Sequence, residues 1–247
     1  MSENTLQTLA AMLAQGASEE DVARALLEMT LDAAPPDVAE AVRAAALPAW
    51  FDAELLAYLL EIDEVEAECL LKEIAAFSFT QPREDGGYVY HEATRARLLS
   101  AWKADSRRAR FTALAKRLAQ RYLALARKHS PRLKGPEYLE ALTILDAAYS
   151  NIQAAWENAV TAELWNLIPA FAYAETADYQ SHRGLWQDWI QWTESGIEAA
   201  RQIKDNVTVA SLQNNLGNAY LRLPTGDRAA NLQRAIDCYQ QALRFRT

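Results

Sequence analysis

The chain has few residues suited to covalent or metal cross-links. Its 247 residues include two cysteines, Cys69 and Cys238, and three histidines, none of them in a metal-ligand spacing such as His-Glu-x-x-His. The two cysteines lie far apart within helical patterns, so we interpret them as small buried apolar residues in a reducing compartment. We therefore expect no disulfide framework, no metal site and no other cofactor.

Membrane and secretion signals are missing as well. No apolar run approaches the roughly 18 residues of a membrane span, and residues 1–10 lack the basic start and apolar core of a secretion signal. Hydrophobic residues make up 51% of the chain and charged residues 23%, which is typical of a folded globular protein. The sequence thus predicts a cytoplasmic protein without a membrane partner.

Glycine is scarce and scattered, with eight residues in total, and no Gly-x-x-x-x-Gly-Lys-Ser/Thr phosphate loop occurs in the sequence. A nucleotide-hydrolysing site of that kind needs backbone amides and an ammonium group to neutralise phosphates. The Gly-x-Ser-x-Gly motif is also absent, and Glu61 and Glu64 fit a solvated helix face better than a catalytic carboxylate pair. We predict no catalytic residues and no enzymatic activity.

Helical periodicity dominates the N-terminal third of the chain. Ser18 is a plausible N-cap, because acidic residues follow it in the first turn. In the helix expected at about 64–76, Val65, Cys69, Leu70, Ile74 and Phe77 should lie on or near one apolar face. The pattern predicts helices at about 4–15, 18–28, 37–46, 52–60 and 64–76.

A β-hairpin follows these helices. Residues 77–81 and 88–91 are short aromatic-rich segments, and Asp85-Gly86-Gly87 between them is strong turn chemistry. Three helices followed by a hairpin predict a winged helix-turn-helix. Its second helix and lead-in carry six acidic residues against one lysine, so we expect this helix to pack against protein and not to enter a DNA groove. The six are Glu61, Asp63, Glu64, Glu66, Glu68 and Glu73.

Residues 44–102 are similar to the winged-helix domain of STAND-class signalling ATPases, the apoptotic-ATPase and bacterial MalT-like group. Tyr90-His91-Glu92 matches the Met-His-Asp-like motif of that family at the histidine alone. The resemblance implies that His91 is a remnant of the residue that contacts the diphosphate of bound ADP. The other interpretation is that His91 caps or packs at the junction between hairpin and helix. Because the phosphate loop is missing, the resemblance also implies an NTPase in a separate chain or domain.

Charge is unevenly distributed. Residues 95–134 hold 13 Lys or Arg and one acid, a charge of +12, whereas the remainder of the chain carries −20. Within 106–129, apolar residues at helical spacing predict a basic amphipathic helix. Such a helix contacts either nucleic acid or acidic helices of the same protein, and both interpretations stay open. The basic surface residues are Arg107, Arg110, Lys116, Arg117, Arg121 and Lys128.

The C-terminal part predicts helical repeats. After a break at Pro131 and Gly135-Pro136, the helix at about 139–160 is similar to the connector that follows the winged helix in MalT-like proteins. We expect a helix pair at about 161–181 and 185–202. Trp186, Trp189, Ile190 and Ile197 form one stripe, with Trp192 beside it, which favours a core between stacked helices over an exposed aromatic patch.

The last pair, about 207–222 and 228–245, looks like a tetratricopeptide (TPR) repeat with a lengthened turn. The resemblance rests on Leu216-Gly217, Tyr220, Ala235, Tyr239 and Ala242-Leu243. One helix face carries polar residues at intervals of three or four, and the resemblance places this face in the concave groove. Asn amides and an Arg suit the recognition of a peptide, although a plain solvated face has the same pattern. The four residues are Ser211, Asn214, Asn218 and Arg222.

The prediction is a mainly α protein, a winged helix-turn-helix with one β-hairpin followed by a TPR-like α-helical repeat array. We expect a non-catalytic protein–protein interaction module, a sensor, adaptor or scaffold of a STAND-like signalling or defence system. The alternative is a nucleic-acid-associated regulator that uses the basic surface of 95–134. The expected parts are a helical lead at 1–34, the winged helix at 35–105, the connector at 106–160 and the repeats at 161–247.

Overall fold

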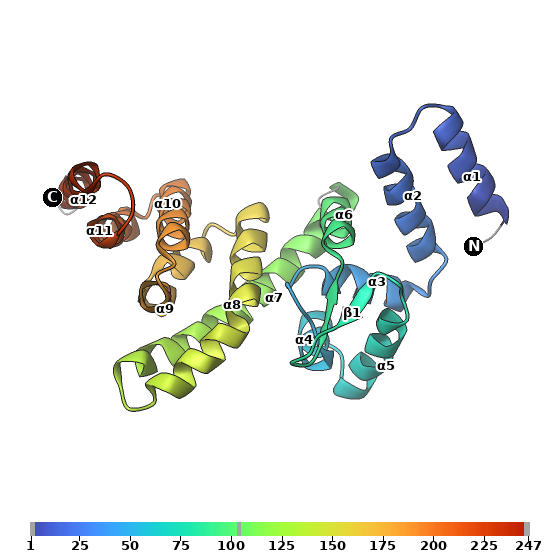
Figure 1. Cartoon of the computed structure of the whole chain (residues 1–247), viewed down its shortest axis with the longest axis horizontal. Coiled ribbons are helices and arrows are strands. Elements are labelled where there is room, and N and C mark those ends of the chain that lie inside the picture. Colours follow the sequence, from blue (N-terminus) through green and yellow to red (C-terminus); the bar gives the residue numbers. More distant parts are fainter. Residues whose placement is uncertain (1–2, 103–104, 245–247) are drawn as a thin grey trace. The chain divides into compact units, whose positions relative to one another are not determined.

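The computed structural model describes residues 3–102 and 105–244, and the structural statements below concern these residues. They form twelve α-helices, two short 3-10 helices and one two-stranded antiparallel sheet, so the chain is mainly helical (Figure 1). The chain divides into two compact units. The first comprises residues 1–46 and 50–108, and the second comprises 47–49 and 109–247.

In the first unit, α3 lies against α4, α5 and α6. Buried hydrogen bonds join β2 and α6 to α3. The Tyr90 hydroxyl of β2 donates to the Val42 carbonyl at 3.1 Å, and the Trp102 indole of α6 donates to the Arg43 carbonyl at 2.6 Å. Apolar side chains fill the space between the helices. The elements are α1 (Glu3–Ala14), α2 (Glu19–Asp32), α3 (Pro36–Ala45), α4 (Ala53–Leu60), α5 (Glu64–Ala75), β1 (Thr80–Pro82), β2 (Tyr88–Tyr90) and α6 (Glu92–Trp102).

The expected helices at 37–46, 52–60 and 64–76 are confirmed within two residues, but the expected apolar face of α5 is wrong in part. Val65 is 72% exposed and Cys69 is exposed, whereas Leu70 and Ile74 are buried. At about 100° per residue, Val65 and Cys69 lie roughly 140–180° around the helix from Ile74. Cys69 is therefore not the buried apolar residue that we expected, whereas Cys238 is buried.

The predicted hairpin is present, with a shorter first strand than expected. Thr80 pairs with Tyr90, but the chain at 77–79 forms a turn in which the Thr80 amide donates to the Phe77 carbonyl at 3.0 Å. Gly86 and Gly87 have φ of 96° and 75°, which suits glycine in a tight turn. On its other edge, β2 meets Phe51 through a single bridge to Tyr88.

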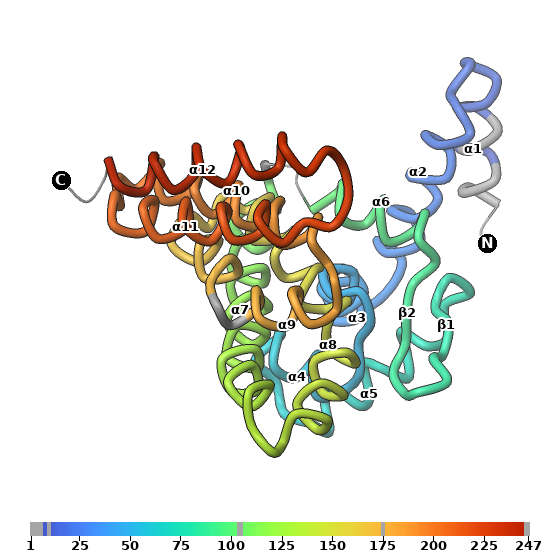
Figure 2. The backbone as a smooth tube through the Cα atoms, turned by 60° about the vertical axis from the view of Figure 1, so that its left-hand side comes forward, coloured from blue at the N-terminus to red at the C-terminus, as the bar shows by residue number. Residues whose placement is uncertain are grey.

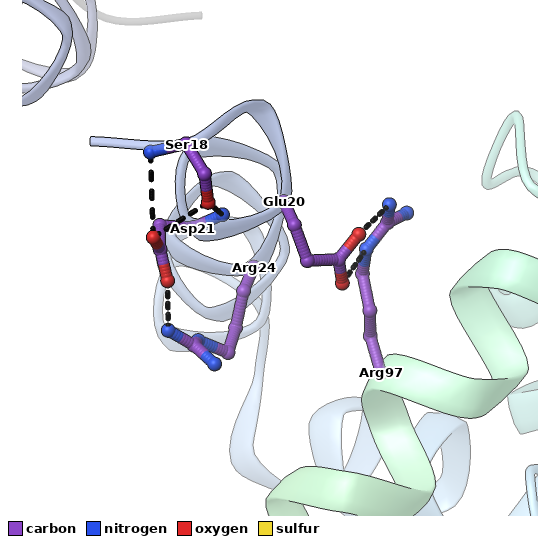
Figure 3. Close-up of polar contacts among 5 residues, drawn as sticks. All are labelled: Ser18, Glu20, Asp21, Arg24 and Arg97. Atoms are coloured by element: carbon purple, nitrogen blue, oxygen red, sulfur yellow. Dashed lines mark hydrogen bonds and ion pairs between the residues drawn. The ribbon is translucent and has the colours of Figure 1, made fainter. Parts of the chain in front are cut away.

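α2 is joined to the rest of the first unit by ion pairs as well as by buried leucines. Ser18 caps the helix and Asp21 closes the capping box (Figure 3). From the same turn, Glu20 accepts two hydrogen bonds from Arg97 of α6 at 2.9 and 2.7 Å. This hydrogen-bonded pairing lowers the pKa of the Glu20 carboxyl. About two turns further along α2, Glu28 pairs with Arg43 and Arg107.

The second unit is built almost entirely of helices. Most of α7 belongs to it, and the predicted apolar face of this helix is confirmed, because Phe111, Leu114, Leu118 and Tyr122 are buried. The elements are α7 (Asp105–His129), the 3-10 helix η1 (Ser130–Lys134), α8 (Tyr138–Thr161), the 3-10 helix η2 (Ile168–Ala172), α9 (Ala174–Arg183), α10 (Trp186–Gln202), α11 (Asn206–Arg222) and α12 (Arg228–Arg244).

Two buried asparagines of α8 hold the segment 47–49 in the second unit. The Asn151 carbonyl oxygen accepts from the Ala49 amide at 2.7 Å, and its amide donates to the Tyr122 hydroxyl at 2.7 Å. Asn158 donates to the Leu47 carbonyl at 2.9 Å. Both side chains are satisfied, so their burial fixes the path of this segment without an unpaired polar group.

The expected helix at 161–181 is wrong. α8 ends at Thr161, where Glu163 takes a left-handed φ of 55°, and the chain continues through η2 before the shorter helix α9 begins. Pro169 lies within η2 and cannot donate a backbone hydrogen bond, which disfavours a continuous α-helix through this stretch.

The stacking of α10, α11 and α12 confirms that the tryptophan stripe is core. Trp189, Ile190 and Ile197 are buried in one cluster with α11, while Trp186 is partly buried against it. Trp192 is buried on another side of α10, among Tyr149, Trp156 and Phe171. Figure 2 shows α11 and α12 side by side along their length. Gly217 of α11 lies in this contact, next to the Tyr239 ring of α12.

We expect Gly217→Ala to destabilise the second unit. A Cβ at this position would lie 2.5 Å from the Tyr239 ring, so the two helices must separate or the ring must move. Overpacking of this kind costs about 1–3 kcal/mol, and the gain in helix propensity of about 1 kcal/mol offsets part of it. Urea unfolding followed by tryptophan fluorescence measures the difference.

Gly135→Ala is the matched control, because its added Cβ has no neighbour closer than 3.8 Å. A Gly217→Ala variant that is more stable than the parent chain by the full propensity gain of about 1 kcal/mol would contradict the close contact between α11 and α12.

A second prediction concerns the pH dependence of α2. The pKa of Glu20 is lowered in the folded state, so its pairing with Arg97 contributes above the pKa of an unpaired glutamate, about 4.3, and is lost as pH falls through the lower folded value. Glu20→Gln should speed amide exchange in α2 at pH 7. At pH 3 the variant and the parent chain should exchange alike, after correction for intrinsic rates. A difference that persists at pH 3 would mean that the variant acts through packing.

Candidate recognition site

The polar face predicted on α11 is present and lies opposite the buried side of the helix. Asp205 caps α11 by accepting from the Thr208 amide at 3.0 Å, and this bond lowers the pKa of the Asp205 carboxyl. The buried side is apolar apart from one glutamine and consists of Val209, Ala210, Leu212, Gln213, Leu216, Gly217 and Ala219. Packing of this side against α10 and α12 leaves the polar face, Ser211, Asn214, Asn218 and Arg222, toward the surface.

Neighbouring helices hold two of the four polar-face residues. The Asn218 carbonyl oxygen accepts from the Tyr239 hydroxyl of α12 at 2.9 Å, and Arg222 donates to the Ser181 hydroxyl of α9 at 3.3 Å. Ser211 donates to the Val207 carbonyl within its own helix at 3.0 Å. Asn214 is exposed. The site therefore draws on α9, α11 and α12.

Tyr239 connects the packing of α11 and α12 to the polar face. Its ring fills the space beside Gly217, and its hydroxyl binds the Asn218 carbonyl oxygen. Burial raises the pKa of Tyr239, so the hydroxyl stays neutral and remains a donor at physiological pH. Because the Asn218 carbonyl oxygen accepts this bond, the amide nitrogen of the same side chain is the group that can donate to a ligand.

A pocket of about 300 Å³ lies between the α9–α10 turn and the α11–α12 turn. Leu185, Trp186 and Leu223 provide apolar walls, and Asp188 and Thr225 add polar groups. Leu223 directly follows Arg222, so the polar face leads into this turn pocket. Sequence reasoning missed the pocket, although the lengthened turn around Pro224 marked the segment that helps to line it.

His91 lies at the junction of β2 and α6, on the surface of the first unit. Its backbone amide donates to the Phe79 carbonyl at 3.0 Å, and its ring Nε2 lies 3.1 Å from the Gln81 side-chain nitrogen. In the tautomer with its proton on Nδ1, the His91 ring accepts a hydrogen bond at Nε2 from the Gln81 side-chain amide. Both interpretations of His91, the nucleotide-sensing remnant and the junction residue, stay predictions.

The basic residues of 95–134 are to a large extent engaged within the protein. Arg107 lies 3.3 Å from Glu28, Arg132 pairs with Glu137 and Glu140, and Lys134 pairs with Asp178. Arg110, Arg117 and Arg121 also interact within the protein, whereas Lys116 and Lys128 are exposed. Lys103 lies outside the described residues. This pairing favours internal compensation of the charge over a surface reserved for phosphates.

Residues 3–102 and 105–244 show neither a cluster of metal-binding side chains nor a membrane-spanning helix. Within these ranges, no group of three or more His, Cys, Asp or Glu side chains is arranged to hold a metal ion. The same residues contain no helix whose length and apolar character would let it cross a membrane.

Comparison with known proteins adds no functional information. No protein-family model, no curated protein and no solved structure matches this chain. The polar face, the turn pocket and the charge distribution are therefore the features of the chain that bear on function.

We expect the chain not to bind duplex or single-stranded DNA tightly at physiological salt. Fluorescence anisotropy of labelled DNA, from about 50 to 200 mM salt, measures this directly. Any binding at the lowest salt should be weak and should fall further in a Lys116→Glu/Lys128→Glu variant. Tight binding with a steep salt dependence would contradict the internal pairing, because it would show that several phosphates are neutralised.

Proposed function

We propose that this chain is a non-catalytic protein-recognition module, the sensor, adaptor or scaffold of a STAND-like signalling or defence system. Its second unit would bind an extended segment of a partner protein or peptide along the polar face of α11. The helix pairs α9–α10 and α11–α12 are proposed as TPR-like repeats, and α3 to β2 as a winged helix. An NTPase that acts with this module would be a separate chain or domain.

The observation that carries the proposal is the fixed arrangement of the polar face beside the turn pocket. Asn218 is oriented by Tyr239, and Arg222 is held beside Ser181, so neither side chain has to be ordered fully when a ligand binds. Preorganised polar groups lose less conformational entropy on binding. A solvated face without a role needs no such support from neighbouring helices.

The chemistry of these groups suits an extended peptide. The free amide of Asn214 and the amide nitrogen of Asn218 can hydrogen-bond to a peptide backbone, which offers a carbonyl and an N–H at each residue. The Arg222 guanidinium can bind a carboxylate at two points. An apolar side chain of the same peptide would enter the turn pocket against Trp186 and Leu223.

The order of elements supports the winged-helix part of the proposal. α3 is followed by Phe51, which bridges to β2, and then by α4, α5 and the hairpin β1–β2. α5 presents Glu64, Glu66 and Glu73 to solvent. Because a helix with this charge is repelled by phosphates, we propose that the first unit contacts protein. The nucleic-acid alternative rests on the charge of +12 in residues 95–134, and Arg107, Arg132 and Lys134 of this segment are paired with acidic side chains of the protein.

The test is selection of peptides from a displayed library of unstructured sequences, followed by anisotropy with one selected peptide. We expect Asn214→Ala/Asn218→Ala to weaken binding at least about tenfold, which corresponds to roughly 1.4 kcal/mol. The thermal midpoint should change little, because both side chains lie on the surface side of α11. Gln241→Ala, an exposed change on α12, is the matched control.

Equal affinity of the double variant and the parent chain would remove the polar face from the binding site. A large fall in the thermal midpoint would make the loss of binding uninformative for the double variant. In that case Asn214→Ala alone decides, because Asn214 lies exposed and outside the Tyr239 hydrogen bond.

A further inference from the structure

Another pocket lies inside the first unit, between α2, the turn before β1 and α6. Its volume is about 300 Å³, at the lower end of the range for small-molecule sites. Leu26 and Leu27 of α2 and the side chains of Phe77 and Phe79 provide its apolar walls. The two phenylalanine rings stack with their centroids 5.1 Å apart, so they form one aromatic surface. We call this cavity the α2 pocket.

The α2 pocket also has a few polar groups. Ser78 and Thr94 add hydroxyls, and Arg97 is the one charged residue among the described residues that line the pocket. A hydroxyl can donate or accept a hydrogen bond, whereas a guanidinium donates and carries a fixed positive charge. Apolar and aromatic walls with a small number of polar groups are typical of sites that bind and orient small molecules.

Arg97 can donate to a ligand as well as to Glu20. Its Nε and Nη2 donate to the Glu20 carboxylate at 2.9 and 2.7 Å (Figure 3), and within the described residues its Nη1 has no partner. The Glu20 side chain is 61% exposed and does not line the pocket, whereas the Arg97 side chain is 23% exposed. Exposed ion pairs are weak. A ligand carboxylate in the pocket can therefore compete with Glu20 for the guanidinium.

We propose that the α2 pocket binds a small monocarboxylate with one aromatic ring or a branched aliphatic body. The body packs between the leucines of α2 and the two phenylalanine rings, and the carboxylate binds the Arg97 guanidinium. Glu20 weakens this binding, because its carboxylate neutralises the same guanidinium. The site lies in the first unit and does not rest on peptide binding by the polar face of α11.

Other classes of small molecule fit the α2 pocket less well. A phosphate ester carries a charge of about −1.5 to −2 at pH 7, and such groups are usually bound by clusters of arginines. The described lining holds one arginine, and Glu20 already neutralises part of its charge. A neutral apolar molecule would fill the walls but gain nothing from the charge of Arg97. An acid and its uncharged amide therefore distinguish these classes.

The test uses a panel of monocyclic carboxylates, each paired with its primary amide, such as phenylacetate and phenylacetamide. Amide chemical shifts of the isotope-labelled full chain report where each compound binds. We expect acids of the panel to shift the amides of α2, residues 77–79 and α6, with Kd of about 1 mM or below. Each matched amide should bind at least about tenfold more weakly. The proposal is overturned if no acid shifts these segments, or if acids and amides bind equally.

Two variants that remove the same ion pair separate ligand binding from a structural role of Arg97. Arg97→Gln should weaken the acid at least about tenfold and make it equal to the amide. Glu20→Gln should strengthen the acid about two- to fivefold and leave the amide unchanged. Arg24→Gln, which removes an exposed cation of α2 outside the pocket, is the matched control and should change neither.

Opposite effects of the two variants on the acid are the result that only ligand binding explains. If loss of the ion pair merely disturbs α2, both variants weaken the acid and the amide alike, and the proposal is overturned. A Glu20→Gln variant that binds the acid more weakly than the parent chain overturns it as well. None of these results bears on peptide binding by Asn214 and Asn218.

Discussion

The close approach of α11 to its two neighbours is the constraint on which the second unit depends. On one side Gly196 of α10 leaves room for Leu212, and on the other Gly217 leaves room for the Tyr239 ring of α12. A side chain at either glycine would meet its neighbour at less than 3 Å. Helices this close exclude water from both contacts, so most of the apolar surface of α11 is buried although the helix lies near the end of the unit.

This packing also determines how the candidate site is presented. Because two sides of α11 are occupied by α10 and α12, its rotation about its own axis is fixed, and the polar face has one orientation. The Tyr239 side chain carries both the packing and the hydrogen bond to Asn218. The candidate site and the stability of the second unit are therefore linked at α12, and changes at Asn214 separate the two better than changes at Tyr239.

The sequence predicted local features better than their tertiary surroundings. The turn at Gly86-Gly87 and the buried tryptophan stripe were predictable, because turn chemistry and helical period act over a few residues. The helix expected at 161–181 was wrong because the apolar residues there pack without a helical period around Pro169. The turn pocket could not be predicted, since its walls come from the start of α10 and from the turn after α11, about 35 residues further along the chain. Whether the polar face binds a peptide depends on a partner that a periodic pattern does not specify.

The apolar stripe of α12, formed by Leu232, Ile236 and Leu243, differs in kind from the other exposed apolar residues. Val65, Leu139 and Val207 are each more than 70% exposed, yet each stands at a separate place in the chain. Single exposed apolar residues are normal on protein surfaces and need no partner. The three residues of the stripe share one helix face, and each has a counterpart 46 residues earlier that lies at or near the core. The stripe is therefore one continuous apolar face of α12, next to the face that packs against α11.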